Sequence, residues 1–171
     1  PLSWQSQPTL FERLGPRAQA CRVVQPSAFV GSGLTLAAFR GAEAVPAETL
    51  DERVDAAARA LRRGAECVYL YWGEIDHAGH AAGWTSGEWV AELESFDSAV
   101  ASLARSVPRG TLIVITADHG MVDVGTRIDL ADSPRLREGA DLVAGEDRAV
   151  QVYTREPEAL AARWREELGE S

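Results

Sequence analysis

All three histidines of the chain lie in two short segments that also contain carboxylates and glycines. The residues concerned are Asp76, His77 and His80 in the first segment and Asp118 and His119 in the second. Carboxylate oxygens and imidazole nitrogens that converge can bind a divalent ion, and this mixed set suits zinc, manganese or iron better than calcium or magnesium. Glycines beside such ligands let the backbone approach an ion or a phosphate closely.

Two apolar runs, 67–72 and 112–115, precede these segments and predict the strands that position them. Neither run alternates with polar residues, which is typical of strands covered on both faces, so Cys67 is expected to be buried and inert. Ligands of such sheets bind beyond the carboxyl ends of the strands. We therefore expect both histidine segments at one edge of a sheet, the first of them in a glycine-rich loop over 73–83.

The remaining pattern alternates helices and strands and predicts an α/β fold, a three-layer α/β/α sandwich. Capping boxes predict three helix starts, at Thr9, Thr49 and Thr85. Apolar residues spaced by four and three predict a long amphipathic helix, and they are Trp89, Leu93, Phe96, Val100 and Leu103. Short strands are expected at 21–24 and 149–154, and loops with one short strand over 123–147. Pro157 predicts the start of a last helix that ends at Gly169, with three apolar residues directed inward, namely Leu160, Trp164 and Leu168.

Length and composition exclude several classes of protein. The 171 residues suit one domain, and 46% hydrophobic with 25% charged residues is an ordinary globular balance. A net charge of −9 disfavours binding to nucleic acid, and no apolar run reaches the roughly 20 residues that span a membrane. Two cysteines fit a reducing interior, which favours the cytoplasm but fixes no compartment. The lysine-free composition, rich in alanine and arginine, suggests a bacterial genome of high GC content.

The two segments resemble the type I phosphodiesterase/nucleotide pyrophosphatase family, which belongs to the alkaline phosphatase superfamily. The matching motifs are Asp76-x-x-Gly79-His80 and Thr116-Ala117-Asp118-His119-Gly120-Met121. The resemblance extends to residues 31–35, 89–103 and 145–149, so it covers most of the chain. One departure is Ile75, which stands where the family usually has proline.

The resemblance implies an incomplete alkaline phosphatase-like sheet and a site for two divalent ions, expected to be zinc, with manganese or iron as alternatives. By motif position, Asp76 and His80 belong to one ion, and Asp118 and His119 to the other. The family hydrolyses phosphodiester or nucleotide pyrophosphate bonds in small substrates through a covalent intermediate on a Thr or Ser. The segments that carry this nucleophile, a further Asp and a further His have no match here. Residues 1–171 are therefore expected to be a partial catalytic domain that has little activity alone.

Other polar residues near the motifs have simpler interpretations. His77 and Asp123 are expected to hydrogen-bond to the ligands rather than to bind metal, and Glu74 to be a loop carboxylate. Ser32 and Thr35 are interpreted as helix-capping residues rather than nucleophiles. No chemistry is assigned to Asp97, which is interpreted as a solvated or helix-capping residue, or to Trp89 and Trp164, which are expected to pack in the core. Two other functions stay open: a related superfamily enzyme, such as a phosphonoacetate hydrolase or a phosphomonoesterase, and a metal-binding domain without catalysis.

Overall fold

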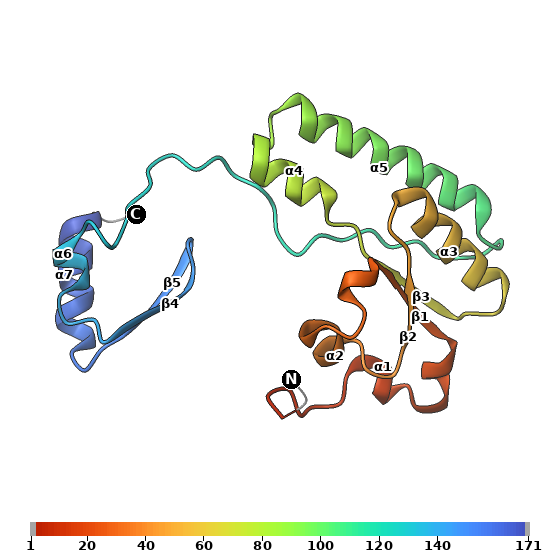
Figure 1. The fold of residues 1–171 in the computed structure, drawn as a ribbon, viewed down its shortest axis with the longest axis horizontal. Coiled ribbons are helices and arrows are strands. Elements are labelled where there is room, and N and C mark those ends of the chain that lie inside the picture. Colours follow the sequence, from red (N-terminus) through yellow and green to blue (C-terminus); the bar gives the residue numbers. More distant parts are fainter. Residues whose placement is uncertain (1–2, 170–171) are drawn as a thin grey trace. The chain divides into compact units, whose positions relative to one another are not determined.

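The computed structural model describes residues 3–169, and the chain divides into two compact units, 1–123 and 124–171 (Figure 1). The first unit is built on a parallel sheet with strand order β2-β1-β3. Its strands are β1 (Cys21–Gln25), β2 (Glu43–Pro46) and β3 (Cys67–Leu70). Val24 of the central strand lies opposite Val45 on one side and Leu70 on the other.

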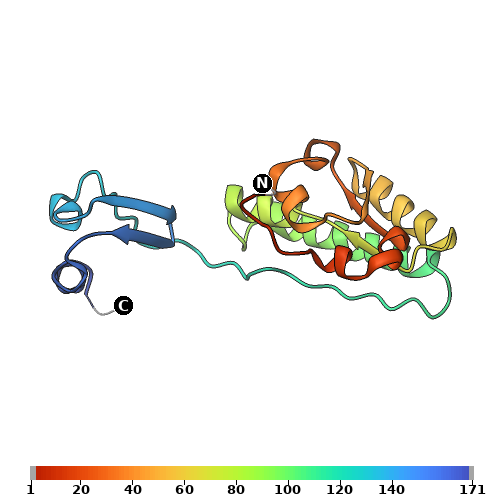
Figure 2. The same cartoon turned by 90° about the horizontal axis from the view of Figure 1, so that it is seen from below.

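Helices cover both faces of this sheet. Successive side chains of β1 point to opposite faces, so neighbouring residues of this strand pack against different helices. Val24 packs with Ala56 and Ala57 of α3 (Leu50–Arg62), whereas Val23 packs with Phe11 of α1 (Leu10–Arg13) and with Phe39, which follows α2 (Gly33–Ala38). Two further helices, α4 (Glu74–Ala82) and α5 (Gly87–Ser106), complete the unit, and α5 packs along α3 and α4 (Figure 2). The predicted three-layer α/β arrangement is confirmed.

The helix starts follow local side-chain chemistry. Thr9 and Thr49 form the predicted capping boxes, and Ser32 caps α2 by accepting the backbone N–H of Thr35. The prediction of Thr85 as the third cap is wrong by one residue, because the hydroxyl of Ser86 accepts the N–H of Trp89 instead. Short 3-10 helices span Gly15–Ala20 and Ser27–Phe29.

The strand β3 is less covered than its sequence predicts. Cys67 and Tyr69 are exposed, and among the described strands only β1 is hydrogen-bonded to β3. The prediction that Cys67 is buried is therefore wrong. Its partner in register on β1, Cys21, is buried against α1, because the central strand has neighbours on both sides and the edge strand does not.

The predicted strand at Leu112–Ile115 is not formed. Residues 112–128 make no backbone–backbone hydrogen bond within the described chain. Leu112, Val114 and Ile115 are 84%, 74% and 60% exposed. A strand needs a neighbouring strand to satisfy its backbone groups, and an apolar β-branched run does not form one without that partner.

The second unit is a hairpin with two helices. Its elements are α6 (Pro134–Arg137), β4 (Leu142–Glu146), β5 (Ala149–Tyr153) and α7 (Pro157–Leu168). The strands pair antiparallel, and the last helix ends at Gly169 as predicted. Leu160 is buried and Trp164 donates its indole N–H to the carbonyl of Leu136, whereas Leu168 is 38% exposed, so its predicted inward position is wrong.

None of the helices among residues 3–169 combines the length and the apolar character that crossing a lipid bilayer requires.

Candidate metal centre

The first motif lies on a helix rather than in the predicted loop. Helix α4 begins after a short link, residues 71–73, that follows β3, and its first turn contains Glu74 and Asp76, which the helix dipole favours at that end. Gly83, with a φ of +89°, ends the helix in a conformation that suits glycine. The glycines and polar residues of this segment suggested a loop, but only Gly83 interrupts the helix.

The helix brings the two proposed ligands of the first motif together. Asp76 and His80 are one turn apart, and Oδ1 of the carboxylate lies 3.4 Å from Nε2 of the imidazole. Both side chains are more than half exposed. Two ligand atoms bound to one tetrahedral zinc ion lie about 3.4 Å apart when each bond is about 2.1 Å long. The spacing of this pair therefore fits two ligands of one ion.

The second motif follows the extended run 112–115. Oδ2 of Asp118 lies 3.7 Å from Nε2 of His119, a spacing close to that of the first pair. The Nδ1 atom of His119 lies 2.9 Å from the carbonyl oxygen of Gly120. Because a carbonyl can only accept, Nδ1 carries the proton of this hydrogen bond, and the lone pair of the neutral ring is on Nε2. This is the tautomer that binds metal through Nε2.

A methionine joins the two motifs. Gly79 is buried between Asp76 and His80, and a Cβ atom at this position would overlap Sδ and Cε of Met121. The same Cβ would lie 3.1 Å from Cδ1 of Trp89 on α5. The side chain of Met121 thus packs directly on the backbone of α4, where only glycine leaves room for it. The second motif is held beside the helix that carries the first.

Two other contacts agree with this arrangement. A Cβ atom on Gly83 would lie 3.8 Å from Oδ1 of Asp123, which places the chain beyond Met121 at the end of α4. Burial raises the pKa of the Tyr69 hydroxyl, and electrostatic repulsion from the neighbouring Tyr71 and Asp118 side chains raises it further. Asp118 therefore lies within electrostatic reach of β3.

The four proposed ligands form two pairs rather than one cluster. Within residues 3–169, no three or more His, Cys, Asp or Glu side chains are placed to hold a single ion. His77 is exposed on α4, and Asp123 is exposed near Gly83. Each pair contributes one carboxylate and one imidazole, a donor set that fits zinc but leaves half of its four coordination positions to other groups.

Sequence reasoning missed one residue of this region. Arg53 of α3 is 2% exposed and forms an ion pair with Glu74, which the sequence predicts to be a loop carboxylate. The only available signal was an arginine one position before Val54, at the border of the apolar face of the predicted helix. The contact of Met121 with Gly79 could not be predicted, because it depends on a helix where the sequence predicts a loop over 73–83.

In a parallel α/β sandwich, ligands bind beyond the carboxyl ends of the strands, and Asp76 and His80 follow that end of β3. The sequence model for the type I phosphodiesterase/nucleotide pyrophosphatase family matches residues 17–171, and the chain belongs to this family. It is thus a hydrolase of the phosphodiesterase/pyrophosphatase type. The family is generally metal-dependent, and a small-molecule substrate fits it. No curated protein and no solved structure matches the chain significantly.

Proposed function

We propose that Asp76 and His80 bind one divalent ion, that Asp118 and His119 bind a second one, and that both ions are zinc. The observation that carries this proposal is the packing of Met121, a residue of the second motif, on Gly79 of the helix that contains the first motif. The membership of the family supports it, since the four residues are those that match the family's motifs.

In this proposal the centre hydrolyses phosphodiester or nucleotide pyrophosphate bonds. A pair of divalent ions supplies the positive charge that stabilises the attacking and leaving oxygens of a phosphoryl transfer. The carboxylates of Asp76 and Asp118 offset the charge of the ions, and the hydrogen bond from His119 to Gly120 holds that ring with Nε2 directed toward Asp118.

The nucleophile is proposed to come from outside these 171 residues. The two hydroxyl groups weighed earlier, on Ser32 and Thr35, hydrogen-bond to each other, and Ser32 also caps α2. Among the described residues, the only other side chain that hydrogen-bonds to either hydroxyl is Gln25, whose amide cannot act as the base that activates a nucleophilic hydroxyl. A Thr or Ser and further ligands from other parts of the protein would complete the centre, so residues 1–171 are proposed to be part of a larger catalytic domain.

The proposed substrate is a small phosphodiester or a nucleotide rather than a polymer. The chain carries a net charge of −9, which repels a long phosphate backbone but acts less on a short substrate held by two ions. His77 and Asp123 are proposed to hydrogen-bond near the ligands without binding metal.

A metal titration tests the assignment of ligands. Zinc added to the 171-residue chain should bind weakly, because each ion gains only two protein ligands. His80→Ala and His119→Ala should each weaken one binding event at least tenfold in calorimetry. Asp97→Ala serves as the control, since it removes an exposed carboxylate from the neighbouring helix α5 that has no assigned role, and it should leave both events unchanged. Equal losses in all three variants would contradict the assignment.

Substrate class is tested on a longer version of the protein that includes the nucleophile. It should hydrolyse an aryl phosphodiester faster than the corresponding monoester or phosphonoacetate. A preference for the monoester would instead favour the phosphomonoesterase alternative, and no turnover with intact metal binding would favour a domain that binds metal without catalysis.

A further inference from the structure

Arg53 is an arginine in the interior of the first unit. It is on the second turn of α3, and its side chain is 2% exposed. Burying a guanidinium is costly unless every N–H group has an acceptor, and such a residue therefore indicates a specific network. The exposed pair of Arg17 and Glu66, with side chains 73% and 53% exposed, has no comparable surroundings.

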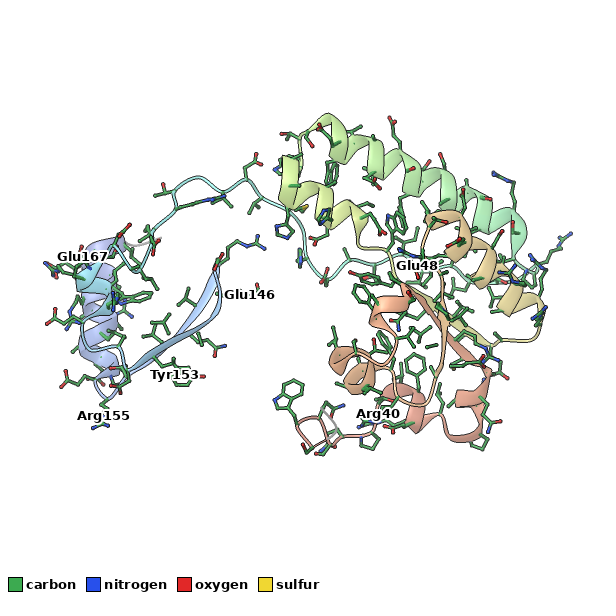
Figure 3. All side chains as sticks on the ribbon, in the orientation of Figure 1. Arg40, Glu48, Glu146, Tyr153, Arg155 and Glu167 are labelled. Carbon is green, nitrogen blue, oxygen red and sulfur yellow. The ribbon has the colours of Figure 1, made fainter. Side chains whose placement is uncertain are left out.

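All five N–H groups of Arg53 have acceptors. Nε donates to the carbonyl of Ala47 at 3.1 Å, and Nη2 donates to the carbonyl of Glu48, labelled in Figure 3, and to Oε1 of Glu74 at 3.0 Å. Nη1 donates to the carbonyl of Tyr71 at 3.3 Å and to Oε2 of Glu74 at 3.2 Å. The two bonds to Glu74 form the bidentate geometry that only arginine provides.

The network joins three parts of the chain at the end of the sheet. These parts are the loop before α3, the end of β3 and the first turn of α4. The guanidinium carbon also lies 4.6 Å from the centre of the Trp72 ring, in the link between β3 and α4. The carboxylate of Glu74 also accepts the backbone N–H of Gly73. The first residue of α4 is therefore held both by Arg53 and by the backbone that precedes the helix.

We propose that Arg53 is a positioning residue for the metal centre: its bidentate pair with Glu74 sets the direction in which α4 leaves β3, and thereby the place of Asp76 and His80. Glu74 is two residues before Asp76 on the same helix, so a rotation of the first turn displaces both proposed ligands together. This inference rests on the proposed function, since it assumes that Asp76 and His80 bind an ion.

The test uses cobalt(II), because its visible absorption spectrum reports the geometry of its ligands. In the 171-residue chain, Arg53→Lys keeps the charge and removes the bidentate geometry, and Glu74→Gln keeps the shape of the partner side chain. Each change should weaken cobalt binding about tenfold or more and alter the spectrum, as changes behind metal ligands commonly do. Arg17→Lys, the same substitution in the exposed pair with Glu66, is the matched control and should change neither.

Each other result overturns the proposal. If both variants are less stable to heat but bind cobalt with unchanged affinity and spectrum, Arg53 has only a structural role. If Glu74→Gln weakens binding and Arg53→Lys does not, Glu74 is itself a ligand. If Arg53→Lys does not fold, an unchanged cobalt affinity and spectrum in Glu74→Gln is by itself enough to overturn the proposal. Failure of the proposed function gives a different result. In that case the unsubstituted chain and His80→Ala would bind cobalt equally, since the proposed site would not exist.

Discussion

Substituting Gly79 by alanine should separate the stability of the fold from the assembly of the metal centre. The added methyl group would overlap Sδ and Cε of Met121, which lie at the end of a flexible side chain and can move away. Gly79 has a negative φ inside α4, so alanine fits the backbone and should stabilise the helix by about 1 kcal/mol. The structure therefore predicts that the methyl group displaces Met121 without unfolding α4.

The cost of this displacement is comparable with the gain. Full burial of a methionine contributes about 1.5–3 kcal/mol, and Met121 is partly buried, so its displacement should cost about 1 kcal/mol. The free energy of unfolding should then change by less than about 1 kcal/mol. Residues 118–121 have no backbone–backbone hydrogen bonds to hold them in place, so loss of the Met121 contact should weaken metal binding at Asp118 and His119 about fivefold.

Urea denaturation and cobalt titration of Gly79→Ala measure the two effects. Gly87→Ala is the matched control, because a Cβ atom there meets nothing within 4 Å. In the double variant Gly79→Ala/Met121→Ala the overlap with Met121 is gone and only the contact with Cδ1 of Trp89 at 3.1 Å remains, so its cobalt affinity should be close to that of Met121→Ala alone. An unchanged cobalt affinity in Gly79→Ala, or a loss of stability above about 3 kcal/mol, would refute the reasoning.

Three further predictions follow from other features of the chain. A thiol reagent at pH 8 should modify Cys67 much faster than Cys21, because Cys67 is exposed whereas burial raises the pKa of the Cys21 thiol; Cys67→Ser should therefore remove the fast reaction in a mass-spectrometric time course. The backbone N–H groups of Thr49 and Glu48 lower the pKa of Glu52 below its ordinary value of 4.5. The contribution of Glu52 to the free energy of unfolding is therefore fully present above pH 4.5 and is lost as the pH falls through its folded-state pKa. Glu52→Gln should make the urea midpoint less sensitive to acid as the pH falls below 4.5, and an equal acid sensitivity would count against this cause. The 171-residue chain with added zinc or manganese should hydrolyse an aryl phosphodiester near the background rate, and turnover that is abolished by EDTA and by His119→Ala would show that its own residues suffice.

The parts of the fold that depend on neighbouring residues in sequence were predictable. The capping boxes at Thr9 and Thr49 are formed by side chains and backbone three residues apart, so the sequence contains all that the helix start requires. The same logic failed by one residue at α5, where Thr85 and Ser86 are both able to cap and the structure uses Ser86. Strand β2 was missed, because its four residues, two of them half-buried, show no clear apolar pattern.

The parts that depend on distant partners were not predictable. Leu112–Ile115 has the composition of a strand, but strand formation is decided by a neighbouring edge that the run itself does not contain. The four proposed ligands were identified from residue type and motif alone. The contact between Met121 and Gly79 and the network of Arg53 join segments far apart in the sequence, and only a folded chain brings them together.

The unpaired run after α5 has a consequence for handling this chain at high concentration. Residues 111–117 are Thr-Leu-Ile-Val-Ile-Thr-Ala, seven residues without charge, proline or glycine, and Leu112 and Val114 are largely exposed. Short segments with this composition stack into cross-β fibrils when identical copies meet, because each backbone then pairs with the copies above and below it. Arg109 and Asp118 are the nearest charged residues on either side, which places one charge of each sign where natural sequences place residues that limit such stacking. Replacing Asp118 is therefore expected to have an effect beyond metal binding: it removes one of the two charges that flank this segment and should make the chain aggregate more readily.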